Sequence, residues 1–167
     1  MEKNKRTFAA LVTQAVTPKG SSSPKQKEIL VPIDFSEPSL SALRHARELA
    51  TQQKARLILL NVIEEPASFR TLDVVGQQRA RCKQRSGRLH EIAERELGSQ
   101  VANTIEVREG KPSVEIARFA SQRQVDLIVM GQHQHHGLRR WFQGHTASRL
   151  SKNAPCALVV FKADHLN

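Results

Sequence analysis

The sequence predicts an α/β protein built on an open, five-stranded parallel sheet with helices on both faces. Apolar segments with the length of buried strands alternate with amphipathic segments at helical spacing, in the order β-α-β-α-β-α-β-α-β. Aromatic residues are few (six Phe, one Trp and no Tyr), and an aliphatic core suits strands that are covered on both faces. A chain of 167 residues is long enough for one domain with a sizeable core.

The first strand and helix have the clearest signals. Residues 28–33 (EILVPI) form a short apolar segment with Asp34 at its carboxyl end. Ser36 is a typical N-cap residue, and Pro38 fits a first helical turn. Apolar residues then recur at helical spacing, so we predict a helix over residues 37–53.

The middle of the chain predicts two further strands around a polar helix. The second strand covers residues 56–63, and the third covers residues 102–107. The helix between them covers residues 77–97 and ends at Gly98, a common C-cap residue. Residues 67–75 give no clear prediction.

The last third of the chain predicts two helices and two strands. Residues 110–112 turn the chain, and Ser113 is predicted to cap the next helix. The fourth strand covers residues 126–130, and the fifth covers residues 157–161. A helix from about residue 144 to residue 153 connects them.

The net charge of +10 is unevenly distributed. Residues 1–27 carry half of it, with six Lys or Arg against Glu2. Such an arm is compatible with an anionic partner, but a solubilising role is favoured, and nucleic-acid binding is not expected because aromatic residues are few. The predicted second helix also has a basic face, which is expected to be solvated: Arg79, Arg81, Lys83, Arg85 and Arg88.

The same start of the chain predicts the domain boundaries. Pro, Gly and Ser over residues 17–24 are typical of a linker, and a weak helix over residues 6–16 is an alternative upstream. We therefore predict a disordered basic arm over residues 1–26, one folded domain over residues 27–163, and a tail over residues 164–167.

Cysteine use and hydropathy point to the cytoplasm. Cys82 and Cys156 lie far apart without a CxxC spacing, which favours neither a zinc site nor a disulfide framework. No apolar run reaches the roughly 18–20 residues of a membrane-spanning helix. We expect no membrane association and a cytoplasmic protein.

Residues 131–156 (GQHQHHGLRRWFQGHTASRLSKNAPC) are the strongest functional signal. A buried strand that leads into a glycine-punctuated loop and a helix directs backbone N–H groups and the helix dipole at a phosphate. Ligands of open α/β sheets bind beyond the carboxyl ends of the strands, where the strand order reverses. If the first and fourth strands are neighbours there, Asp34 and Gly131 face one cleft.

Residues 27–162 resemble the universal stress protein family. The resemblance is carried by ILVPIDFS at residues 29–36, by LLNV at residues 59–62, and by DLIVMG at residues 126–131 through APC at residues 154–156. It implies a Rossmann-like fold, similar to the adenine nucleotide alpha hydrolases, with strand order 3-2-1-4-5. It also implies a protein that is usually dimeric, with an ATP-binding cleft in one branch of the family.

The glycine pattern of that nucleotide-binding branch is only partly kept. It consists of Gly, two residues, Gly, nine residues, and then Gly-Ser or Gly-Thr. Gly131 and Gly144 match the first and last glycines, whereas Gln134 and His145 replace the middle glycine and the hydroxyl residue, with Thr146 one position later. A side chain in place of glycine limits how closely backbone approaches a phosphate.

Carried over residue by residue, the resemblance implies a nucleotide site made by four segments. Asp34 would meet the ribose or a metal-bound phosphate, and the structural alternative is an acid that initiates the following helix. Val62 would contact adenine through its backbone, and the alternative is core packing. The implied residues are Pro32, Ile33, Asp34, Val62, Met130, Gly131, His133, Gly144, His145, Thr146 and Ala147.

We therefore expect a stress-response protein that binds ATP or a related adenine nucleotide, with or without Mg²⁺, at the carboxyl ends of strands 1 and 4. It would act as a sensor or regulator with at most weak ATP hydrolysis, because the sequence offers no Ser-His-Asp arrangement or paired carboxylates. The alternative is a non-nucleotide-binding dimeric interaction module whose cleft is blocked by Gln134 and His145.

Two further expectations concern metal and self-association. The clustered histidines suggest a metal site, but a solvated loop is favoured because no cysteine or acid completes the set: His133, His135, His136 and His145. The apolar strand over residues 157–161 is predicted to be an unpaired edge, so we expect a homodimer in which it pairs with a second copy.

Overall fold

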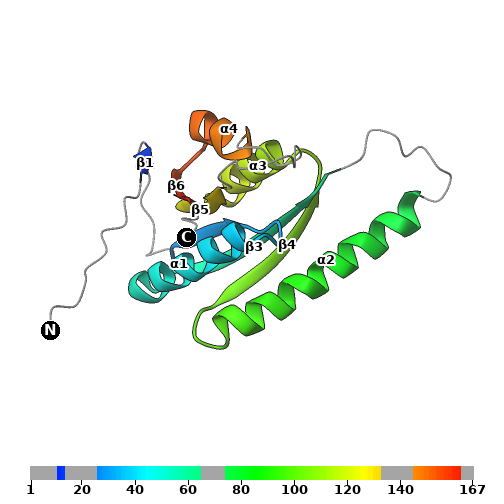
Figure 1. Cartoon of the computed structure of the whole chain (residues 1–167), viewed down its shortest axis with the longest axis horizontal. Helices are drawn as coiled ribbons and strands as arrows, with labels where there is room; N and C mark the ends of the chain where they lie inside the picture. The colour runs from blue at the N-terminus through cyan, green and yellow to red at the C-terminus, as the bar shows by residue number, and fades with distance from the viewer. Residues whose placement is uncertain (1–10, 14–25, 65–73, 133–144, 163–167) are drawn as a thin grey trace, which may run out of the picture.

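The computed structural model describes residues 11–13, 26–64, 74–132 and 145–162, which fold as one sheet with helices on both faces (Figure 1). The strands of the sheet are β1 (Leu11–Thr13), β2 (Glu28–Pro32), β3 (Arg56–Ile63), β4 (Asn103–Glu109), β5 (Leu127–Gln132) and β6 (Ala157–Lys162). The helices are α1 (Glu37–Gln53), α2 (Val74–Leu97), α3 (Pro112–Arg123) and α4 (His145–Asn153).

The sheet has the predicted strand order. It runs β1-β6-β5-β2-β3-β4, and strands β2 to β6 are all parallel. With β1 set aside, this is the expected order 3-2-1-4-5. The neighbours β2 and β5 are the first and fourth predicted strands, so the strand order reverses between them, where a ligand site is expected.

Two apolar layers cover the sheet, one on each face. Side chains of β3 alternate between them, with Leu57 and Leu59 on the face of α1 and α2 and Ile58 and Leu60 on the face of α3. All four are almost fully buried. This double covering explains why the strands appear in the sequence as continuous aliphatic runs.

The helix boundaries follow their capping residues, with one correction. Ser36 is the N-cap of α1, and Gly98 follows α2 with a left-handed φ of 56°. The prediction that Ser113 caps the next helix is wrong, because α3 begins at Pro112 with Lys111 as N-cap. Proline has a fixed φ and no N–H, and therefore suits the first helical position.

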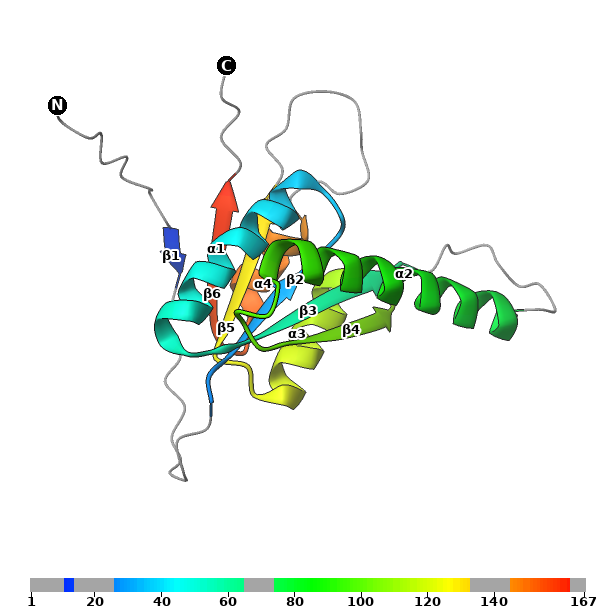
Figure 2. The same cartoon turned by 90° about the horizontal axis from the view of Figure 1, so that it is seen from below.

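Strand β1 is the feature that the sequence did not predict. It pairs antiparallel with β6, with Val12 opposite Val159, where a weak helix over residues 6–16 was an alternative (Figure 2). The prediction of an unpaired β6 edge is therefore wrong over Leu158 to Val160. Edge strands carry unpaired backbone groups that attract a partner. The rest of the predicted arm before Gln26, and the tail, lie outside the described residues.

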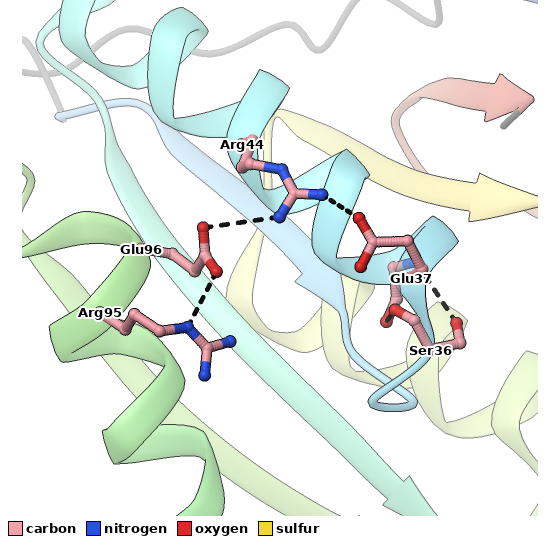
Figure 3. A network of polar contacts seen from close by, with 6 residues as sticks. Ser36, Glu37, Arg44, Arg95 and Glu96 are labelled. Atoms are coloured by element: carbon pink, nitrogen blue, oxygen red, sulfur yellow. Dashed lines mark hydrogen bonds and ion pairs between the residues drawn. The ribbon is translucent and has the colours of Figure 1, made fainter. Parts of the chain in front are cut away.

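A polar network joins α1 to the end of α2 (Figure 3). Arg44 of α1 forms ion pairs with Glu37 and, at 3.7 Å, with Glu96 of α2. Arg47 of α1 donates a hydrogen bond of 2.7 Å to the backbone carbonyl of Glu96. Partly exposed ion pairs contribute only about 0–1 kcal/mol each, so the network mainly aligns the two helices.

Candidate functional site

A cavity of about 360 Å³ lies at the carboxyl ends of β2, β3 and β5. The strand order reverses between β2 and β5 at this point of the sheet, and the first turn of α4 forms part of the cavity wall. The lining residues are Pro32, Ile33, Asp34, Ser39, Leu60, Asn61, Val62, Ile63, Glu64, Arg85, Pro112, Ile116, Met130, Gly131, Gln132, Thr146 and Ala147.

Most of the predicted site residues meet in this cavity. They come from the ends of β2 and β5, from β3 and from the start of α4: Pro32, Ile33, Asp34, Val62, Met130, Gly131, Thr146 and Ala147. His133 and Gly144 lie outside the described residues, as does Gln134. His145 is the first residue of α4, and its side chain is not among those described.

Asp34 has the helix-initiating role that was the structural alternative for it. Its Oδ1 accepts a hydrogen bond of 3.0 Å from the backbone N–H of Ser36 and another from the Ser36 hydroxyl. The intervening Phe35 has a left-handed φ of 67°. An Asp that accepts from the backbone two residues on stabilises such a turn. The carboxyl group is exposed at the rim of the cavity, so the turn also fixes its position there.

Gly131 has a packing reason that the sequence did not reveal. A Cβ atom at this position would lie 2.1 Å from the backbone oxygen of Pro38 and 2.3 Å from its carbonyl carbon. Real Cβ atoms do not approach that closely, so the first turn of α1 sits against β5 only because residue 131 is glycine. The absent side chain makes room for the protein's own backbone.

Asn61 joins the ends of two strands beneath the cavity. Its side chain is 4% exposed, and Nδ2 donates a hydrogen bond of 2.7 Å to the carbonyl of Ile33. The Ile33 N–H in turn donates to the carbonyl of Leu60 at 2.8 Å. Buried polar groups with such partners hold one geometry, so Asn61 fixes the position of Ile33 and of the following Asp34.

The cavity combines apolar walls with a polar rim. Apolar side chains make the walls, namely Ile33 directly after β2, Val62 of β3, Met130 of β5 and Ile116 of α3. Thr146 adds a hydroxyl in the first turn of α4, where backbone N–H groups lack intrahelical acceptors and the helix dipole is positive. Such a slot can hold a flat apolar ring with a polar or anionic group at its mouth.

Arg85 of α2 also lines the cavity, and sequence reasoning missed it. Its helix face was expected to be solvated. Arg79, Lys83 and Arg88 are indeed exposed, whereas Arg81 and Arg85 are part-buried. A usable signal was nevertheless present, because Arg85 lies four residues before Leu89, in line with the stripe of apolar residues that α2 buries.

The described residues offer no metal cluster. No group of three or more His, Cys, Asp or Glu side chains is placed to hold an ion within residues 11–13, 26–64, 74–132 and 145–162. The loop histidines His133, His135 and His136 fall outside these ranges. In the same ranges, no helix combines the length and the apolar character needed to cross a membrane.

Both cysteines are free thiols with raised pKa values. Burial raises the pKa of Cys156 to about 11, with a further contribution from the charge of Asp126. The pKa of Cys82 is raised by burial first, and then by the hydrogen bond to Glu109, which lies 3.4 Å from Sγ, and by its charge. Both groups are therefore poor nucleophiles near neutral pH.

Comparisons with known proteins agree with this geometry. The model of the Universal stress protein family matches residues 26–162. A universal stress protein of Methanocaldococcus jannaschii is 32% identical over 143 residues, which cover 81% of this chain and 82% of that protein.

Solved structures show the same fold. A second universal stress protein of M. jannaschii, 26% identical to this chain, superimposes with a TM-score of 0.64 and covers 83% of this chain and 97% of its own. A universal stress protein from Archaeoglobus fulgidus, solved in complex with dAMP, gives a TM-score of 0.52 at 19% identity, covering 81% and 96%.

Proposed function

Because the chain belongs to the universal stress protein family, we propose that it binds ATP or a related adenine nucleotide in the cavity between β2 and β5. We propose further that it acts in the cytoplasm as a sensor or regulator rather than as an enzyme of turnover. The observation that carries the proposal is the cavity itself, which gathers residues from four segments at the reversal of strand order.

The size and chemistry of the cavity suit a nucleotide. Its volume of about 360 Å³ falls in the usual range for small-molecule sites, about 300–1,000 Å³. The adenine ring would lie between the apolar walls made by Val62, Ile116 and Met130. Asp34 at the rim would meet a ribose hydroxyl or a phosphate-bound Mg²⁺, and the first turn of α4 would offer N–H groups to phosphate.

A fold neighbour gives independent support for this ligand class. The A. fulgidus protein was solved with dAMP, an adenine nucleotide. The similarity at 19% identity concerns the fold, and the ligand is a property of that protein. It supports adenine as the base to test first on this chain.

Binding without rapid turnover is the expected behaviour. Among the described lining residues, Asp34 and Glu64 are the carboxylates, and neither histidine nor cysteine is present. A phosphate site without a positioned general base or activated nucleophile is expected to hydrolyse ATP weakly at most.

Nucleotide content and affinity test the proposal together. Protein purified without added nucleotide is denatured, and the released small molecules are identified by chromatography and mass spectrometry. The same protein is titrated with a fluorescent ATP analogue in the presence of Mg²⁺. We expect saturable binding that unlabelled ATP reverses. Absence of both bound nucleotide and saturable binding at millimolar concentration would contradict the proposal.

A matched pair of variants separates the two roles of Asp34. Asp34→Asn keeps an oxygen that can accept the Ser36 hydrogen bonds but removes the charge. If the carboxylate meets phosphate-bound Mg²⁺, this variant loses the Mg²⁺ dependence of ATP binding at unchanged stability. Ser36→Ala disrupts the same turn and keeps the charge, and is expected to retain that dependence.

The alternative function is a dimeric interaction module whose cleft is blocked by Gln134 and His145. It makes an opposite prediction for the double variant Gln134→Gly and His145→Ser. A parent protein without nucleotide binding should then gain it in the variant. A parent that already binds ATP excludes this alternative.

A homodimer through β6 remains part of the proposal, with a condition that β1 imposes. A second copy can pair with the outer edge of β6 only where that edge is not paired with β1. Leu11→Pro together with Val12→Pro removes consecutive backbone donors, one of which points to β6. We expect this variant to dimerise more strongly in sedimentation experiments, and unchanged association would count against a dimer through this edge.

A further inference from the structure

The inner face of helix α2 is apolar in its second half and polar in its first half, and the boundary between the two lies beside the cavity. Its second half buries Leu89, Ile92, Ala93 and Leu97 against the sheet. The same stripe continues into the first half with polar, part-buried side chains, including Gln78, Cys82 and Arg85. Since α2 follows β3 and precedes the parallel strand β4, its first half lies toward the carboxyl ends of the strands, where it projects beyond the sheet (Figures 1 and 2).

Arg85 is held at the cavity by an aromatic ring. Its guanidinium carbon lies 5.2 Å from the centroid of the Phe35 ring, and that of Arg88 lies 4.3 Å from it. A guanidinium within about 6 Å of a ring centroid is attracted to the ring face. Phe35 itself is placed by the left-handed turn between Asp34 and Ser36. The turn that directs Asp34 to the rim therefore also positions a cation there.

The charges around the cavity leave Arg85 available to a ligand. It is the one cationic side chain among the described lining residues, which also include the carboxylates of Asp34 and Glu64. Among the described residues, no carboxylate forms an ion pair with Arg85 at 4.0 Å or less. A part-buried guanidinium that has no ion-pair partner among the described residues suits an anion, and its planar fork matches phosphate oxygens.

We propose that Arg85 is an anion-binding residue of the cavity, which contacts the phosphate groups of the bound nucleotide and makes the site prefer nucleotides over nucleosides. The proposal rests on the proposed nucleotide binding. At the start of α4, the described side chains that line the cavity include no cation, and Thr146 offers only a hydroxyl. In this proposal the cation comes from α2 instead. Arg88 also lies over the Phe35 ring, but it is exposed and does not line the cavity.

The test compares phosphate-bearing and phosphate-free ligands on matched variants. Dissociation constants for ATP, AMP and adenosine are measured by calorimetry on the parent chain, on Arg85→Gln, on Arg85→Lys and on Lys83→Gln. Lys83 is exposed on the same helix and outside the cavity lining, so Lys83→Gln removes the same charge without touching the site. Thermal unfolding of each variant checks that the fold is retained.

We expect Arg85→Gln to weaken ATP and AMP by about tenfold to a hundredfold, which is typical for the loss of a charged hydrogen-bond partner. Adenosine affinity should change by less than about twofold. Arg85→Lys keeps the charge without the fork and should fall between parent and Arg85→Gln. Equal weakening of adenosine and ATP, no weakening at all, or an equal effect of Lys83→Gln would each overturn the proposal while nucleotide binding stands.

Tripolyphosphate separates this inference from the proposed function. If the parent binds neither ATP nor adenosine, the proposed function fails, and tripolyphosphate binding is then measured on the same variants. Binding that Arg85→Gln abolishes and Lys83→Gln preserves would support Arg85 as an anion-binding residue. Absence of binding, or binding that is independent of Arg85, would overturn the proposal as well.

Discussion

Helices α1 and α2 lie on the same face of the sheet, yet they are attached to it in different ways (Figure 1). Helix α1 is buried along its whole length through mostly small side chains, namely Ser39, Ala42, Leu43, Ala46 and Ala50. Among the described side chains of helix α2, the fully buried ones all lie in its second half. Small side chains allow close, rigid contact, whereas the first half of α2 presents polar side chains, of which Arg85 lines the cavity. The same face of the sheet therefore carries one helix that is packed along its whole length, α1, and one whose first half presents polar side chains, α2.

The largest expected effect comes from removing the anchor of α2. Leu89 is 0% exposed, so Leu89→Ala leaves a cavity in the core and should lower the free energy of unfolding by about 2–5 kcal/mol. Urea unfolding measures the change. Glu91→Ala, at an exposed position on the same helix, should stay within about 0.5 kcal/mol of the parent. A cost below about 1 kcal/mol for Leu89→Ala would contradict the anchoring role of this half.

Substitution of glycine by alanine should have opposite effects on stability at the contact with α1 and on α2. Gly131→Ala places a Cβ against the Pro38 carbonyl of α1 and should destabilise the protein by about 1–3 kcal/mol. Gly87→Ala lies on α2, where the new Cβ has no atom within 4 Å apart from its neighbours in the helix, and should stabilise the protein by about 0.5–1 kcal/mol. Equilibrium unfolding of both variants gives the two signs. Changes of the same sign would remove the contrast between a tightly seated α1 and an open α2.

The smallest expected effect concerns the polar half of α2 and its neighbour on β4. Burial and Glu109 raise the pKa of Cys82, so little thiolate is present at pH 8 and alkylation is slow. Glu109→Gln removes the charge and lowers the Cys82 pKa toward its usual value, which should speed alkylation severalfold. Mass spectrometry follows each thiol separately, and Cys156, whose pKa is about 11, should stay unreactive in both proteins. An unchanged Cys82 rate would show that burial alone controls this thiol.

The sequence predicted the elements whose signals are local. The bounds of α1 were predicted correctly, because the Ser36 cap and the helical spacing act within a few residues. Strand β1 was missed because three residues are too few to show a periodicity, and because its partner β6 lies far along the chain. The start of α3 was misplaced by preferring a serine cap to the proline at the first helical position.

The site was predicted where it follows from topology. Strands of a parallel sheet bring their carboxyl ends to the same side, so Asp34 and Gly131 could be placed together from the strand pattern. Val62 was predicted only from the family resemblance. Arg85 and the packing role of Gly131 depend on how α1 and α2 lie on the sheet. That contact is tertiary. The local signal at Arg85, its place in line with the buried stripe of α2, shows which way the side chain faces but not that it lines a cavity.

Strand β1 occupies the edge of the sheet at which the proposed pairing between copies would take place, so the two would compete. A strand tethered to its own target acts at an effective concentration of about the millimolar range for a short linker, without any strong contact of its own. A second chain at micromolar concentration competes poorly with it. If copies do pair through β6, any event that removes Leu11–Thr13 from this edge would therefore favour that pairing without altering β6 itself.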